Sequence, residues 1–472
     1  MQNLKKGMFF TTIGTYSNFI VQLIVNMVLS RLLVPKDYGV VAIMQIFIIF
    51  FNLMIESGMG PAIIQNKNLS EEDYKVIFNY SAIFALILAV LFGFWGQILV
   101  IIYDNPIYQI ITWIQAIAVF FNGLNIVPTA LLNKSMKFKL VSFSLVLSNI
   151  FSAIVGVSSA LLGFGIYSLI FSSITTAAFN FFLNRHFTKI NFVNSLNINP
   201  LKNIWNFSKN QFAFNFINYF SRNLDNILIG KFMGITNLAN YSKAYQLLML
   251  PNQMFLNVIN PVLQPVLSEY QNDVIYIRTT YFKIIKLLAL FGIPLSVFCS
   301  MSSRQIIMVM FGGQWVDAVI PFSILSLTVW CQLTVSTTGA IFQARNQSNL
   351  LFFTGFISAI ILVSSILIGI LFGSLTSVAI SLSVGFFIGF FWNFSQLIIK
   401  SLNGSMWEFL LLFKSPFFLS ILVFIAIKFE NFFDPKNFFL SLLFRGAIFS
   451  GVTILYILFT PEKDNVKILW NK

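Results

Sequence analysis

The chain has 472 residues, of which 57% are hydrophobic and 9% are charged, and its formal charge is +14. Soluble domains carry roughly 25% charged residues, so this composition, with a mean hydropathy of +0.84, excludes a soluble protein. The basic residues are scattered through short loops, a pattern that sets membrane orientation and does not indicate nucleic-acid binding.

Apolar runs long enough to cross a bilayer recur from end to end and predict an all-α polytopic membrane protein. The first run is not a cleavable signal, because it is too long and no small-residue cleavage site follows it. Fourteen spans are expected, at 8–33, 38–58, 76–103, 107–132, 140–163, 165–185, 210–230, 241–266, 281–302, 318–344, 350–372, 375–399, 409–428 and 437–460.

Basic residues concentrate in the loops on the side of the N-terminus, for example at Lys134, Lys137 and Lys139. The opposite loops have far fewer, among them Arg31 and Lys36. By the positive-inside rule both termini are cytoplasmic, and an even number of spans requires the same arrangement.

An internal repeat appears when the chain is shifted by about 200 residues. Arg31–Gly39 matches Lys231–Ala239 at the end of a span, and Pro61 matches Pro261. The repeat predicts an N-lobe of six spans at 1–200, a parallel C-lobe of six spans at 201–400, and two extra helices with a cytoplasmic tail at 401–472. Repeated halves with a site between them are the usual plan of a secondary transporter.

A polar stripe follows one face of the seventh span, and the first span carries a similar stripe 200 residues earlier. A charge near the bilayer centre costs about 2.5–3.5 kcal/mol, so charges there face a wet cavity or a partner. An ion pair that only locks the seventh span to a neighbour is the alternative. The expected substrate-binding residues are Gln211, Asn215, Asn218, Arg222 and Asp225, with Thr15, Asn18 and Gln22 in the first span.

Other polar positions allow two interpretations each. Glu56, near the end of the second span, is either an ion-coupling carboxylate or an interfacial cap. The fourth span has a polar face that either joins helices or contacts substrate; its members are Gln115, Asn122, Asn125, Thr129 and Asn133.

The sequence contains few residues or motifs that would indicate a catalytic or metal-binding site. One His and two Cys that fall inside predicted helices cannot build a metal centre or a disulfide framework, so no metal and no cofactor is expected. There is no G-x-x-x-x-G-K-[ST] motif, and no loop is long enough for an external catalytic domain. We therefore expect a protein that is not an enzyme.

Four motifs resemble those of one family. They are Arg31-Leu-Leu-Val-Pro-Lys-Asp-Tyr-Gly39, Gly58-Met-Gly-Pro-Ala-Ile-Ile-Gln65, Arg222-Asn-Leu-Asp-Asn-Ile-Leu-Ile-Gly-Lys231 and Phe311-Gly-Gly-Gln-Trp315. Together they are similar to the Wzx-type oligosaccharide flippases, the teichuronic and colanic acid exporter branch of the multidrug/oligosaccharidyl-lipid/polysaccharide superfamily. The segment Asn237-Leu-Ala239 departs from the more usual acidic-x-Gly.

The resemblance implies a V-shaped transporter of two six-helix lobes in the bacterial cytoplasmic membrane. Its substrate would be an undecaprenyl-pyrophosphate-linked oligosaccharide for surface polysaccharide (O-antigen, capsule or exopolysaccharide), flipped outward by alternating access with an ion gradient. Arg222 would offset the pyrophosphate charge, the amide stripe would bind sugar hydroxyls, and Asp225 would couple ions. Membrane lipid would hold the polyprenyl tail, and a polysaccharide polymerase is a plausible partner by pathway logic.

Three other functions compete with this interpretation. A cation-coupled multidrug exporter of the same superfamily would carry more acidic residues in its first lobe. A membrane polymerase or lipid-linked glycosyltransferase would need a larger external loop. A scaffold or scramblase would have no need of matching polar stripes in two lobes.

Overall fold

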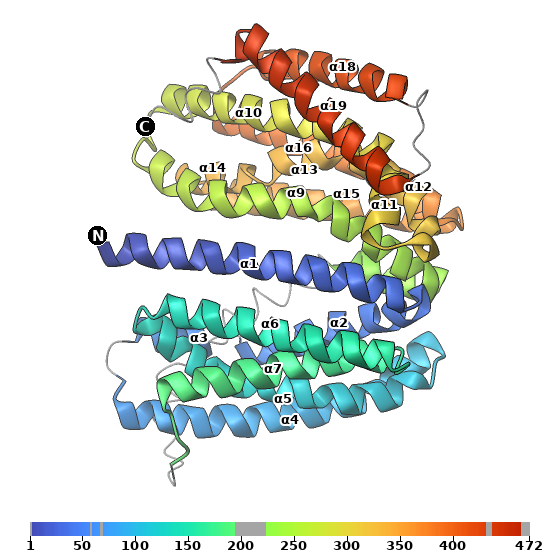
Figure 1. Cartoon of the computed structure of the whole chain (residues 1–472). Helices are drawn as coiled ribbons and strands as arrows, with labels where there is room; N and C mark the ends of the chain where they lie inside the picture. The colour runs from blue at the N-terminus through green and yellow to red at the C-terminus, as the bar shows by residue number, and fades with distance from the viewer. Residues whose placement is uncertain (1, 57–58, 67–68, 194–222, 431–436, 464–472) are drawn as a thin grey trace. The chain divides into compact units, whose positions relative to one another are not determined.

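The structure is a computed structural model that describes residues 2–56, 59–66, 69–193, 223–430 and 437–463 (Figure 1). These residues are helical apart from turns and short connections, and the described ranges contain no strand. They divide into two compact units, Met1–Ala239 and Asn240–Lys472. The lobe boundary expected at residue 200 falls outside the described residues and stays a prediction.

Unit 1 is a bundle of long helices. In it α4 lies along α5, α5 along α7, α7 along α6, and α6 along α1 (Figure 1). Residues 223–233 form a further helix, and α9 (Ile235–Ser268) begins in this unit. The others are α1 (Gln2–Leu32), α2 (Pro35–Glu56), α3 (Met59–Gln65), α4 (Glu71–Tyr103), α5 (Ile107–Lys134), α6 (Phe138–Leu161) and α7 (Tyr167–Thr188).

The pair α4 and α5 shows how the sequence builds this bundle. Ser70 and Asp73 form a capping box that starts α4 five residues before the apolar run expected at 76–103. A Cβ at Gly96 would lie 2.1 Å from Thr112 Oγ1. The absence of a side chain at Gly96 therefore allows the two helices to approach closely, as small residues do between membrane helices.

Unit 2 contains more broken helices. Its elements are α10 (Val274–Met301), α11 (Ser303–Met310), the 3₁₀ helix η1 (Gly313–Ala318), α12 (Val319–Ser326), α13 (Val329–Val335), α14 (Thr338–Ala344), α15 (Ser348–Leu371), α16 (Leu375–Phe394), the π-helix η2 (Ser395–Ser401), α17 (Met406–Leu411), α18 (Lys414–Glu430) and α19 (Phe438–Phe459). Trp330 packs against the rings of Phe390, Phe413 and Phe417. Trp330, Phe390 and Phe413 belong to the largest apolar core described for unit 2.

The expected all-α membrane fold is confirmed. Within the described residues, nine helices are long and apolar enough to cross a membrane, or ten if a bent pair is one span. The count of fourteen is not confirmed. The bent pair, Gly313–Ser326 and Val329–Ala344, turns by 52° inside the span expected at 318–344.

Hydroxyl groups accompany that bend. Thr328 Oγ1 donates to the Leu325 carbonyl at 2.7 Å, and Ser326 Oγ donates to the Phe322 carbonyl. Such bonds compete with the backbone ladder and bend helices, an effect that an apolar run in the sequence does not reveal.

Candidate functional site

Asp225 is the one member of the predicted seventh-span stripe that the structure describes. It lies in the helix 223–233 of unit 1 and is 7% exposed. Its Oδ1 accepts a hydrogen bond from Asn226 Nδ2 at 3.1 Å. A buried carboxylate is costly unless it is hydrogen-bonded or paired. Gln211, Asn215, Asn218 and Arg222 lie outside the described residues.

Among the described side chains of the first-span stripe, that of Asn18 contacts the neighbouring helix α6. Asn18 Oδ1 accepts a hydrogen bond from Asn149 Nδ2 of α6. Gln22 is exposed, and its main-chain carbonyl accepts from Asn26 Nδ2 at 3.1 Å. Thr15 belongs to α1, but its side chain lies outside the described part of the chain, as does the side chain of Glu56 at the end of α2.

The polar face of α5 joins helices within unit 1. Asn184 of α7 donates from Nδ2 to Asn125 Oδ1 at 3.0 Å, to Thr129 Oγ1 at 3.1 Å and to Asn180 Oδ1 at 3.2 Å. Gln115 Nε2 donates to Ser173 Oγ of α7 at 2.7 Å. Of the two interpretations of this face, the described contacts favour interhelical hydrogen bonding. The sequence analysis missed Asn184, although it stands at helical spacing from Asn180.

Lys134, at the end of α5, forms hydrogen bonds with three groups of unit 1. Its Nζ donates to the Ile63 carbonyl at 2.8 Å, to the Asn66 carbonyl at 2.5 Å and to Tyr74 Oη at 2.7 Å. All three ammonium hydrogens thus have acceptors. Lys134 therefore fixes α3, which carries the second family-like motif, to α4 and α5.

Two of the family-like motifs meet at one end of unit 1. Gly39 ends the first motif, and a Cβ there would lie 2.1 Å from the Ile235 carbonyl oxygen. Lys231 ends the third motif, and its Nζ donates to the Ile102 carbonyl in the last turn of α4. The two repeat-related segments are thus in contact, and only glycine fits at position 39 without a shift of the backbone.

The fourth motif surrounds a buried cation in unit 2. Lys243 of α9 is 3% exposed, and its Nζ lies 4.6 Å from the ring centroid of Phe311 and 5.2 Å from that of Trp315. Aromatic faces attract a cation, most strongly when it is desolvated. Phe311 and Trp315 of the motif thus stabilise Lys243, a residue to which the sequence pattern assigns no role.

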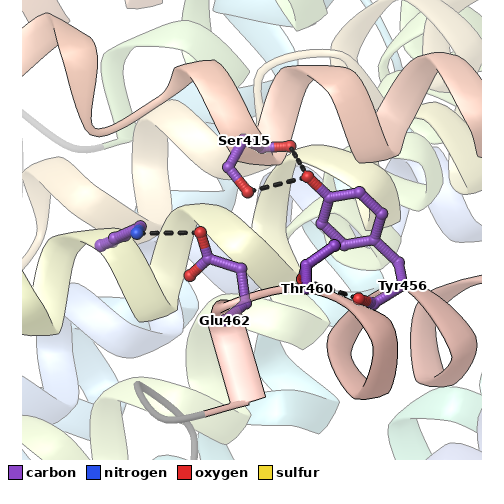
Figure 2. Close-up of polar contacts among 5 residues, drawn as sticks. Ser415, Tyr456, Thr460 and Glu462 are labelled. Atoms are coloured by element: carbon purple, nitrogen blue, oxygen red, sulfur yellow. Dashed lines mark hydrogen bonds and ion pairs between the residues drawn. The ribbon is translucent and has the colours of Figure 1, made fainter.

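Charged side chains also hold the last helix of unit 2. Lys286 Nζ lies 2.8 Å from Glu462 Oε1, with side chains 28% and 6% exposed. Figure 2 shows Glu462 together with Tyr456, whose hydroxyl bonds to Ser415 Oγ at 2.9 Å. Arg445 Nη1 of α19 donates to the Met301 carbonyl at 2.7 Å and to Gln305 Oε1 at 3.1 Å.

Metal-binding groups are sparse in the described ranges, where no cluster of three or more His, Cys, Asp or Glu side chains is found. Cys299 and Cys331 are free thiols. Within the described residues, unit 1 offers the buried carboxylate of Asp225 and several networks of amide groups.

The comparisons with known proteins agree with one another. A family model described as "Polysaccharide biosynthesis protein" matches residues 28–320. The teichuronic acid biosynthesis protein TuaB of Bacillus subtilis (strain 168) is 24% identical over 75% of this chain and 73% of its own. The succinoglycan biosynthesis transport protein ExoT of Rhizobium meliloti (strain 1021) is 21% identical over 72% of this chain and 69% of its own.

Among solved structures, the lipid II flippase MurJ in an inward closed conformation is similar with a TM-score of 0.72. The match covers 94% of this chain and 97% of the other, at 18% sequence identity. At that identity the likeness shows a shared fold.

Proposed function

The chain belongs to the polysaccharide biosynthesis protein family, and from this premise we propose that it flips lipid-linked oligosaccharides across the bacterial cytoplasmic membrane. The observation that carries the proposal is the family match over residues 28–320. The fold shared with a lipid II flippase supports it, as does the transport named for the Rhizobium relative. The substrate we propose is an undecaprenyl-pyrophosphate-linked repeat unit for a surface polysaccharide.

The proposed substrate site centres on Asp225 and Arg222. A guanidinium can pair with two oxygens of a pyrophosphate, and buried ionisable groups in membrane helices are functional by default. Asp225 is buried in unit 1. Burial supports a role in substrate binding, because bulk water would weaken the electrostatic interactions of an exposed carboxylate. The amides proposed to bind sugar hydroxyls are Gln211, Asn215, Asn218, Asn18 and Gln22, with the hydroxyl of Thr15.

The proposed cycle is alternating access of an N-lobe and a C-lobe, coupled to an ion gradient at Asp225 or Glu56. Both termini are proposed to be cytoplasmic, from the distribution of Lys and Arg. A polysaccharide polymerase is the proposed partner. We propose that the chain acts as a transporter and catalyses no covalent step, in line with the flippase and transport proteins it resembles.

The experiment that tests this function is deletion of the gene, scored for surface polysaccharide and for lipid-linked oligosaccharide in the inner leaflet. Loss of the polymer with accumulation of the completed lipid-linked unit is expected. Truncated lipid intermediates would instead identify a membrane enzyme of polysaccharide assembly. An unchanged polymer with altered drug tolerance would identify a multidrug exporter.

The site is tested in the same deletion strain by complementation with point variants. Arg222→Ala and Asp225→Asn should each reduce surface polymer by at least tenfold, because one interaction with a charged group contributes about 1.5–3 kcal/mol. Glu56→Gln is the comparison and should be milder. Normal export by correctly inserted Arg222→Ala and Asp225→Asn chains would overturn the site but leave the flippase function standing.

A further inference from the structure

A cavity of about 350 Å³ lies at the end of unit 1 where the two motifs meet. Three segments line it: the start of α2, the turn after α4, and the junction between the helix 223–233 and α9. All three belong to loops that the Lys and Arg distribution assigns to the side opposite the termini. The cavity therefore lies where a membrane surface is expected.

The polar groups of the cavity carry a net positive charge. Lys36 and Lys231 line it together with one acidic residue, Asp104. Asp37 follows Lys36 in the chain and interacts electrostatically with it, but Asp37 is not among the residues that line the cavity. Counting the lining side chains gives two cations against one anion, which suits a ligand with a single negative charge.

Two lining groups have hydrogen-bonding capacity to spare. Lys231 gives one of its three ammonium hydrogens to the Ile102 carbonyl. The hydroxyl of Tyr103 is buried, and no group in the described part of the chain hydrogen-bonds to it. A buried polar atom without a partner carries a free-energy cost that a ligand can remove.

Exposed apolar side chains stand next to the lining residues. Ile101 precedes the lining residue Ile102 and is 80% exposed, and Phe232 follows Lys231 and is 65% exposed. Side chains of this kind are stable when acyl chains surround them. A cationic cavity beside an apolar surface fits an amphiphile better than a free phosphate ion.

We propose that this cavity binds the headgroup of a membrane phospholipid, with the phosphodiester on Lys36 and Lys231. A phosphodiester carries one negative charge, which matches the net charge of the lining side chains. Asp104 faces the outer part of the headgroup, where a glycerol hydroxyl or an ammonium donates to its carboxylate. The site holds unit 1 at the membrane surface, and it does not depend on the transport function proposed above.

The test is native mass spectrometry of the purified full-length chain titrated with phosphatidylglycerol. Lys36→Gln should weaken binding about fivefold, because a Lys near an anionic lipid surface contributes about that factor. Lys36 is exposed, so this variant should fold normally. The matched control is Lys428→Gln, which removes an exposed lysine at the end of α18 that is not among the residues lining the cavity.

A second variant, which removes a negative charge, tests whether the sign of the charge in the cavity determines binding. Asp104→Asn should tighten phosphatidylglycerol binding, since it removes a negative charge, and Asn tolerates the left-handed φ of 51° found there. Equal binding by Lys36→Gln and Lys428→Gln would overturn the proposal.

Parallel titrations with undecaprenyl pyrophosphate and inorganic phosphate separate the sources of the phosphate group. If Lys36→Gln weakens the binding of undecaprenyl pyrophosphate alone, the cavity is a binding site for the transported lipid and the phospholipid assignment is wrong. If inorganic phosphate displaces phosphatidylglycerol at equal concentration, the lipid assignment is likewise wrong. Resistance of the bound phospholipid to both competitors is the expected result.

Discussion

In unit 1 the hydrogen bonds that cross between α5, α6 and α7 join neutral amides and hydroxyls, whereas in unit 2 charged groups hold the last helix. Asn184 and its three acceptors represent the first arrangement. Arg445 with the Met301 carbonyl, and Lys286 with Glu462, represent the second. Neutral pairs in a membrane protein contribute modestly, while a buried charge that loses its partner is strongly destabilising. These two sets of contacts should therefore respond differently to loss of one partner.

The largest effect is expected for Arg445→Met. Arg445 is buried, and its loss leaves the Met301 carbonyl and the Gln305 amide without their charged donor. The free energy of unfolding should fall by about 2–3 kcal/mol, measured by titration with dodecyl sulfate in mixed micelles. The control Arg304→Met removes an exposed guanidinium near the Phe438 ring and should cost less than about 1 kcal/mol. Equal losses would contradict the assignment of Arg445 as a buried anchor.

An intermediate effect is expected for Lys286→Met, which leaves the Glu462 carboxylate buried without its ion pair. The cost should be about 2 kcal/mol, below that of a fully buried pair because Lys286 is 28% exposed. Lys283→Met is the matched control, since Lys283 is exposed on the same helix. Adding Glu462→Gln to Lys286→Met should restore part of the loss. A strictly additive double variant would refute coupling between the two.

Hydropathy was sufficient to predict the all-α membrane fold, because an apolar run of sufficient length has one stable state in lipid. Hydropathy could not predict which charged side chains at the ends of spans contact other parts of the protein. Lys134 was counted as a loop charge, yet its ammonium group bonds to three oxygens. No sequence pattern singled out Lys243, which lies against two aromatic rings. Their partners are distant in sequence, so no local pattern indicates them.

The candidate substrate site stays a prediction, and Asp225 is the one member of its seventh-span stripe that the structure describes. The sequence singled out Asp225 because a carboxylate in an apolar run is costly, and the structure places it in a buried position. The cavity at Lys36 and Lys231 was not predicted. It arises where the start of α2 meets the start of α9, and tertiary packing rather than spacing brings these lysines to one cavity.

The smallest effect is expected in unit 1, for Asn184→Leu. The substitution removes the amide that joins Asn125, Thr129 and Asn180, and all three of these acceptors are neutral groups. The free energy of unfolding should therefore fall by about 1 kcal/mol, as for other hydrogen bonds between membrane helices.

Ser148→Ala is the matched control, because the hydrogen bond that the described residues show for the Ser148 hydroxyl stays within its own helix, where it donates to the Ser144 carbonyl. It should cost less than Asn184→Leu by the same dodecyl sulfate titration. If Asn184→Leu instead proves as costly as Arg445→Met, the neutral network stabilises unit 1 as strongly as charge stabilises unit 2. The Asn184 cluster would then join helices through strongly coupled hydrogen bonds, and the contrast between the two units would fail.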